Sequence, residues 1–179
     1  MDYLWTPWRY QYIVNAGQAK DCIFCDALVA SDDAQALILF RGKKNFLILN
    51  RFPYTTGHVM VVPYAHQPDL ASTDTTTLQE MMELSRRAQV ALAEVYRPEG
   101  FNLGINLGKC AGAGVASHLH MHILPRWTGD TNFMTVVGET RVQPEDLQTT
   151  YARLKPFFSA TRKQRSARSQ KKRSRRRRM

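Results

Sequence analysis

In the stretch His118-Leu119-His120-Met121-His122-Ile123-Leu124, every second residue from His118 to His122 is a histidine. A period of two is typical of a β-strand, whose successive side chains point to opposite faces of the sheet. Residues two apart along a strand lie about 6.5–7 Å from each other. The three imidazoles would therefore form a row that lines a polyphosphate or brings neighbouring rings together on a metal ion, while the apolar residues between them face the core.

Length and composition place the chain among globular proteins with one domain. Its 179 residues are enough for one sizeable core, and its hydrophobic content of 44% is ordinary for a soluble protein. No apolar run approaches the roughly 20 residues of a membrane span. The first residues lack the basic start and apolar stretch of a signal peptide. We therefore expect a cytoplasmic protein that has no membrane partner.

The net charge of +10 comes from one end of the chain. Residues 161–179 hold 11 of the 25 lysines and arginines and no acid, so the rest of the chain carries 14 basic and 15 acidic residues. Such a segment has too little apolar surface to offset the entropy lost on ordering, which predicts a disordered tail after a domain at 1–160. The tail is either a solvated end or a weak, nonspecific site for polyanions such as RNA, DNA or acidic lipid.

The remaining pattern predicts an α+β fold around an antiparallel sheet. Five short runs read as strands, at 36–40, 46–50, 58–63, 101–106 and 118–124. The first three follow one another through short turns, so they should form a meander. Apolar residues three or four apart predict one long helix over Asp74–Tyr96, with Asp74 as its N-cap and with Pro98 and Gly100 after its end. A C-terminal helix should run from Pro144 to about Phe158.

Small and amide side chains flank the histidine strand. The glycine-rich loop over 108–114 precedes it, and small residues let backbone N–H groups approach phosphate oxygens closely. Asn50 and Asn106 end the second and fourth predicted strands. Their amides are natural hydrogen-bond partners for a ribose or a phosphate, although asparagine is also a common turn residue.

Cys22 and Cys25 have the spacing of half a metal site or of a redox pair. Three cysteines cannot all pair within one chain, so a disulfide framework is not expected. A redox pair is disfavoured because the neighbouring sequence does not read as a thioredoxin-like strand and helix. Cys110 is expected to be an inert small residue.

The histidine strand and Pro125-Arg126 after it resemble the signature of the histidine triad family of nucleotide hydrolases and transferases. Further segments occur in the order and spacing of that family: Cys22-Ile23-Phe24-Cys25, Asn50-Arg51-Phe52-Pro53, Gly57-His58-Val59-Met60-Val61-Val62-Pro63, Gly100-Phe101-Asn102 and Asn106-Leu107-Gly108. Leu4-Trp5-Thr6-Pro7-Trp8-Arg9 and Trp127-Thr128-Gly129-Asp130-Thr131-Asn132-Phe133 are most similar to the bacterial branch that contains diadenosine tetraphosphate phosphorylases.

The resemblance implies a role for each matching residue. His120 would be the nucleophile that attacks the α-phosphorus and holds the nucleotide as a covalent phosphoramidate. His122 would contact the phosphate, and His58 would support the site from the adjacent strand. Asn50 would contact the ribose, and Asn106 would bind the scissile phosphate, where charge stabilisation lowers the barrier.

The resemblance also implies a zinc site. In metal-bearing members the remaining ligands match His66 and His118, which with Cys22 and Cys25 make a closed Cys₂His₂ set. Four protein ligands leave no position for water, so the zinc would be structural, and no organic cofactor is expected. A metal-free pair of buried thiols is the alternative.

The chain departs from the common family pattern just before the triad. Gly114-Val115-Ala116-Ser117 stands where many members have a Gln followed by Ser or Thr. Phosphate contacts would then come from backbone amides of the loop, at Gly112 and Gly114, or from Lys109 and Ser117. Arg126 is a further candidate for a phosphate or dimer contact.

These features predict an enzyme that cleaves a dinucleoside polyphosphate such as diadenosine tetraphosphate, with phosphate or water as acceptor. Two alternatives stay open: a metal-dependent hydrolase with His118 and His120 as ligands, and a nucleotide-sensing or RNA-associated binding module without turnover. The resemblance also implies a homodimer or larger homo-oligomer.

Overall fold

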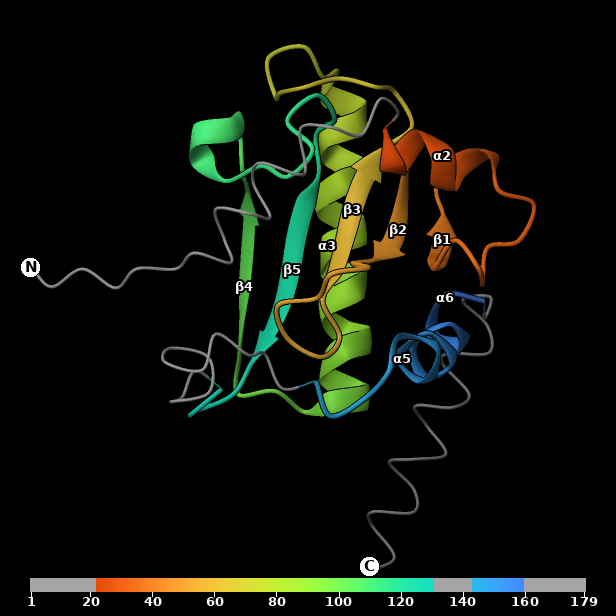
Figure 1. The fold of residues 1–179 in the computed structure, drawn as a ribbon, viewed down its shortest axis with the longest axis vertical. Coiled ribbons are helices and arrows are strands. Elements are labelled where there is room, and N and C mark those ends of the chain that lie inside the picture. Colours follow the sequence, from red (N-terminus) through yellow and green to blue (C-terminus); the bar gives the residue numbers. More distant parts are fainter. Residues whose placement is uncertain (1–21, 131–142, 160–179) are drawn as a thin grey trace, which may run out of the picture.

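A five-stranded antiparallel sheet forms the centre of the computed structural model, which describes residues 22–130 and 143–159 (Figure 1). The strands are β1 (Ile38–Arg41), β2 (Asn45–Leu49), β3 (Val59–Pro63), β4 (Gly100–Ile105) and β5 (Met121–Arg126). Their order across the sheet is β1-β2-β3-β5-β4. The predicted α+β class and the meander of the first three strands are both confirmed.

The long helix α3 (Thr75–Tyr96) covers one face of this sheet, behind β3 and β5 in Figure 1. The apolar side of α3, which includes Met81, Leu84 and Leu92, is buried against the sheet. Strands β2 and β3 are buried along their whole length, in keeping with their nearly continuous apolar sequences.

The ends of α3 follow from local chemistry. The Asp74 carboxylate accepts a hydrogen bond from the Thr77 N–H at 3.0 Å, so the predicted N-cap is confirmed. Arg97 ends the helix in the left-handed region with φ 50, and its N–H donates to the Ala93 carbonyl. Pro98 follows at once and cannot continue the helix.

The C-terminal helix begins later than predicted and is divided in two. Helix α5 (Leu147–Leu154) starts after Asp146, whose carboxylate accepts from the Thr149 N–H at 2.8 Å. The cap at Asp146, and not the proline three residues before the helix, sets its start. Helix α6 (Pro156–Ser159) follows, because the proline ring cannot continue α5.

The C-terminal helices lie beside β1 at the edge of the sheet (Figure 1). The Tyr151 hydroxyl and the Lys155 ammonium both donate to the Ile38 carbonyl at 3.1 Å. These bonds satisfy the backbone where the register of β1 shifts between Ile38 and Phe40. The helices thereby cover an edge that would otherwise be open to pairing with another strand.

Two short helices were not predicted, and one predicted strand starts late. The first is α2 (Ile23–Val29), near the upper ends of β1 and β2 in Figure 1; the second is the single turn η1 (Lys109–Ala111). The strand predicted over 118–124 begins only at Met121. Ahead of it, the Leu119 N–H donates to the Gln67 carbonyl, in the segment between β3 and α3, at 2.6 Å. That bond draws residues 118–120 out of the sheet.

Some predictions fall on residues outside the described ranges. These are the basic tail at 161–179, the segment Leu4–Arg9 and the last part of the segment that starts at Trp127. Among the described residues, no helix combines the length and the apolar character that a membrane span requires.

Candidate functional site

The three alternating histidines lie together but do not form one row. All are buried, with exposed fractions of 1% for His118, 4% for His120 and 8% for His122. The rings of His120 and His122 lie edge to face, with their centroids 4.9 Å apart and an angle of 77° between their planes. Nδ1 of His118 lies near Cys22 and Cys25. His118 and His120 precede β5, so the regular alternation of a paired strand does not extend to them.

The hydrogen bond of His120 fixes where its proton is. Its Nδ1 lies 2.7 Å from the backbone carbonyl of His118. A carbonyl only accepts, so Nδ1 carries the hydrogen and the lone pair of the neutral ring is at Nε2. Burial lowers the pKa of His120 below its usual value. At neutral pH this imidazole is therefore uncharged, with Nε2 as its nucleophilic atom.

The hydrogen bonds around His122 make its Nε2 a donor, whereas Nε2 of His120 carries a lone pair. The Tyr54 N–H donates to Nδ1 of His58 at 3.1 Å, and the Asn50 amide lies 3.2 Å from the same atom. Neutral His58 therefore has its hydrogen on Nε2, which donates to Nδ1 of His122 at 2.8 Å. His122 in turn has its hydrogen on Nε2. Burial and the neighbouring His120 lower the pKa of His122 to about 4, so it stays neutral.

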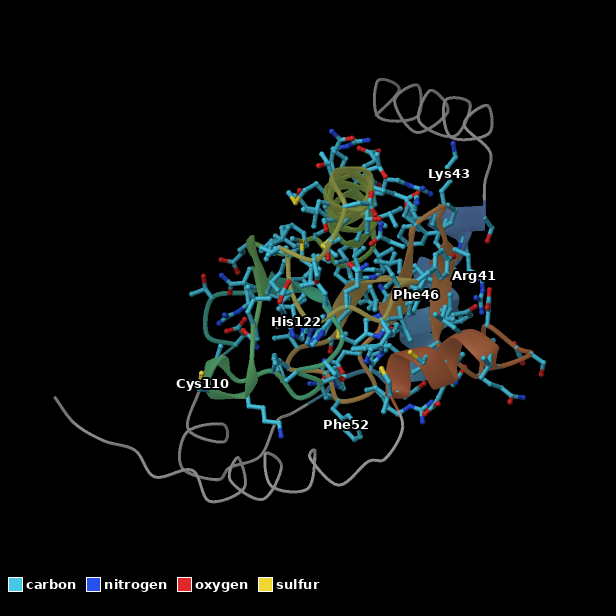
Figure 2. The ribbon with its side chains drawn as sticks, turned by 90° about the horizontal axis from the view of Figure 1, so that it is seen from above. Arg41, Lys43, Phe46, Phe52, Cys110 and His122 are labelled. Carbon is cyan, nitrogen blue, oxygen red and sulfur yellow. The ribbon has the colours of Figure 1, made fainter. Side chains whose placement is uncertain are left out.

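The turn before β3 places His58 in this chain of hydrogen bonds. Gly57 has φ +79, which favours glycine, and a Cβ there would lie 3.0 Å from the Leu92 side chain, which would have to shift. His58 is 1% exposed, next to the start of β3. Met60 pairs with His122 across β3 and β5, so His58, two residues before Met60, lies diagonally across from His122. Figure 2 shows His122 well inside the molecule, with Phe52 and Cys110 at its rim.

Two aromatic residues belong to the site although sequence reasoning gave them no role in it. The ring of Tyr54 lies over His58 and His122, at centroid distances of 4.8 and 5.9 Å. The ring of Phe24 packs against His120 at 5.0 Å. The position of Phe24 between two cysteines was the available signal. Tyr54 offered none, because an aromatic residue in a turn has no periodicity to mark it.

A cavity of about 450 Å³ lies beside these histidines. Its walls come from α2, from the chain entering β1 and from the end of β2, and they are mainly apolar: Ile23, Phe24, Ala27, Ala36, Leu37, Ile48, Leu49, Phe52 and Met60. Asn50 is one of its polar members, and its Oδ1 accepts from the Phe52 N–H at 2.9 Å. Phe24 is the wall that the cavity shares with His120.

The glycine-rich loop brings some of its predicted residues together. The Asn106 amide donates to the Gly112 carbonyl at 3.4 Å, and Gly112 has φ +89. Gly114 and Ser117 lie between η1 and His118. Arg126 pairs with the Asp130 carboxylate and donates to Oδ1 of Asn102 at 2.7 Å, so its guanidinium has partners within the chain.

Cys22, Cys25, His66 and His118 form a cluster suited to a metal ion. Their ligand atoms all lie within 4.8 Å of one another. The Sγ to Nδ1 distances are 3.3 Å for Cys22 and His118, 3.7 Å for Cys25 and His118, and 3.3 Å for Cys25 and His66. In a tetrahedral zinc site, ordinary bond lengths place a sulfur and a nitrogen ligand about 3.5 Å apart.

The surroundings of His118 also suit a ligand. Its Nε2 lies 2.9 Å from the Pro63 carbonyl, so Nε2 carries the hydrogen and Nδ1 offers its lone pair to the cluster. Burial, then the neighbouring Cys22, raises the pKa of the Cys25 thiol. A metal ion must therefore displace a proton from Cys25 when it binds. The residues present fit a metal ion with a Cys₂His₂ ligand set.

Comparison with known proteins agrees with this geometry. The family model for the HIT domain matches residues 31–129. The "AP-4-A phosphorylase" of Mycobacterium tuberculosis is 39% identical over 155 residues, which are 82% of this chain and 79% of that protein. A "ZN-bound histidine triad family protein" from Mycobacterium smegmatis superposes with a TM-score of 0.62 at 27% identity, over 76% of this chain and 92% of its own.

A "hypothetical histidine triad nucleotide-binding protein" from Sulfolobus tokodaii shares the fold, with a TM-score of 0.61 at 24% identity over 76% of this chain and 91% of its own. The family match covers more than half of the chain, and the Mycobacterium tuberculosis relative spans most of it. The chain therefore belongs to the HIT domain family, as the histidine pattern predicted.

Proposed function

We propose that this protein cleaves dinucleoside polyphosphates, with diadenosine tetraphosphate as a suitable substrate, through a covalent nucleotidyl intermediate on His120. The observation that carries the proposal is the opposite protonation of two adjacent rings at Nε2. His120 offers a lone pair at Nε2, and His122 offers an N–H at Nε2. A nucleophile and a hydrogen-bond donor in this arrangement can act on the same phosphoryl group.

The first step would be attack by Nε2 of His120 on the α-phosphorus. A P–N bond forms, the bond from this phosphorus to its bridging oxygen breaks, and ATP leaves with that oxygen. Nε2–H of His122 would donate to a phosphoryl oxygen as its negative charge grows. His122 would be held in the required tautomer by His58 and by the backbone of Tyr54.

The second step would transfer the adenylyl group from His120. Attack by inorganic phosphate gives ADP, and attack by water gives AMP. Both acceptors restore the neutral imidazole, so the nucleophile is the same for a phosphorylase and a hydrolase. The name and 39% identity of the Mycobacterium tuberculosis relative favour phosphate as the acceptor.

The nucleoside would occupy the cavity beside Phe24, since its mainly apolar wall suits a base. Asn50, at the edge of this cavity, would contact the ribose. The phosphates would lie along Asn106, Gly112, Gly114 and Ser117. No step needs an organic cofactor.

Cys22, Cys25, His66 and His118 would hold a zinc ion. When bound, the ion would cross-link three segments of the chain, since its ligands come from three segments. Four protein ligands leave no position for water, so its role would be structural. A catalytic metal on His118 and His120 is disfavoured, since both ring nitrogens of His118 are engaged, Nδ1 with the cysteines and Nε2 with the Pro63 carbonyl. The tail at 161–179 would add weak polyanion binding, and a cytoplasmic homodimer is our expectation for the whole protein.

The proposal is tested by incubating the full chain with diadenosine tetraphosphate, with and without phosphate, and separating the products. ATP and ADP formed only with phosphate identify a phosphorylase, and ATP and AMP formed without it identify a hydrolase. His120→Ala should form neither while keeping its fold by circular dichroism. No turnover by the wild type, or equal turnover by this variant, would favour a binding module and overturn the proposal.

A further inference from the structure

Phe24 belongs to two sites at once. Its side chain is 2% exposed, lines the cavity and packs against His120 at 5.0 Å and His118 at 5.4 Å. In sequence it stands between Cys22 and Cys25, which belong to the metal cluster. A displacement of either cysteine must therefore move a wall of the cavity.

Helix α2, which carries Phe24, depends on tertiary contacts for its position. It has only seven residues, and Cys22 at its N-cap makes no side-chain capping bond. Helices this short are not stable alone. At its other end, the Leu28 carbonyl accepts from Arg41 at the long distance of 3.5 Å. Burial of Phe24 in the core holds this helix against the sheet, and the two thiols at its first turn can add a second anchor through the metal cluster.

The cluster also reaches the nucleophile through His118. The imidazole of His118 faces the thiols, and its backbone carbonyl accepts the hydrogen bond that orients His120. His66 adds a third segment, between β3 and α3. One bound ion would therefore fix both the cavity wall at Phe24 and the carbonyl that sets the tautomer of His120.

We propose that metal binding at this cluster and nucleotide binding in the cavity are thermodynamically coupled, with Phe24 as the positioning residue that carries the coupling. Metal binding would raise the affinity for nucleotide, and nucleotide would raise the affinity for metal by the same factor, as linkage requires. The inference rests on the proposed function only in taking a nucleotide as the occupant of the cavity. A metal ion that serves stability alone would leave the nucleotide affinity of the folded protein unchanged.

The test uses the full chain, with AMP and zinc as the two ligands. Calorimetry gives the AMP affinity of zinc-loaded and chelator-treated protein, each shown to be folded by circular dichroism. Competition with a chromophoric chelator gives the zinc affinity with and without saturating AMP. We expect both affinities to change by one common factor, in the range of about 5–150 that is usual for coupled sites. A control without protein measures the zinc affinity of the chelator in the presence of AMP, and this corrects for direct binding of zinc by AMP.

Phe24→Leu is the matched variant, because it keeps all four ligands and an apolar side chain. It should bind zinc with nearly wild-type affinity in the absence of AMP, and the common factor should fall toward one. Equal AMP affinity with and without zinc in folded wild-type protein would overturn the inference and leave the proposed function intact. Failure of the zinc-loaded protein to bind AMP would instead overturn the proposed function.

Should the metal-free chain unfold, the loaded protein gives a second measurement. The rate at which a chelator removes zinc is followed with and without AMP. The coupling predicts slower release with AMP for the wild type and no slowing for Phe24→Leu. An unchanged rate in the wild type, with AMP binding demonstrated, would overturn the coupling.

Discussion

The buried neutral state of His122 should make the protein lose stability in mild acid. Burial and the neighbouring His120 lower the pKa of His122 from an ordinary 6.5 to about 4. Between these values the unfolded chain binds a proton here that the folded protein does not. Protons therefore favour the unfolded chain as pH falls, and this loss of stability begins near pH 6.5 and is complete below about pH 4.

The pKa difference sets the size of the effect. At pH 5 the unfolded chain would carry the proton on about 97% of molecules and the folded protein on about 9%. At pH 7.5 both forms are almost entirely unprotonated. The free energy of unfolding should fall by about 2 kcal/mol between pH 7.5 and pH 5 because of His122 alone.

His122→Asn isolates this contribution. The Asn side-chain oxygen sits near the former Nδ1, so it can still accept from Nε2 of His58, but it does not titrate. Urea unfolding of both proteins at pH 7.5 and pH 5, with the same zinc concentration, gives for each protein the fall in the free energy of unfolding between the two pH values. Contributions from titratable groups that do not interact with His122 cancel in their difference. A loss that is equal in the two proteins would refute the assignment of a buried, neutral His122.

Three further predictions concern catalysis, the fold and the tail. Burial lowers the pKa of His120, so kcat/KM for diadenosine tetraphosphate should stay level from pH 8 to pH 6; a halving near pH 6.5 would contradict this. Asp74→Ala removes the cap of α3 and should lower the urea concentration at the midpoint of unfolding without changing turnover; an unchanged midpoint would disprove the cap's contribution. A chain that ends at Ala160 should keep turnover but lose retention on immobilised heparin, and retention equal to that of the full chain would exclude the tail as its cause.

The sequence predicted the fold best where an apolar repeat extends over several turns of a helix. The 22 residues of α3 repeat their apolar side over several turns, and Asp74 adds a local signal at the start. The seven residues of α2 offer too short a pattern for this. At the C-terminus, Pro144 and Asp146 are both acceptable near a helix start, and only the hydrogen bond at Asp146 decides between them.

The sequence predicted which residues belong to the site better than it predicted how their side chains are arranged. The spacing of Cys22 and Cys25 and the resemblance of His66 and His118 to family ligands identified the four members of the cluster. The start predicted for the histidine strand was wrong, because a bond from Leu119 to Gln67 precedes the strand and a period of two carries no information on where pairing begins. The tautomers of His58 and His120 depend on backbone partners, and that of His122 depends on His58; no sequence pattern specifies these bonds.

The central claim is the covalent intermediate, and trapping it is the most direct test. The full chain is mixed with diadenosine tetraphosphate without phosphate, quenched in alkali after one turnover and digested for mass spectrometry. We expect one adenylyl group on the peptide that contains His120, located on that residue by fragmentation and lost as ADP forms when phosphate is added before the quench. Turnover without an adduct, or an adduct on His122 instead, would contradict it.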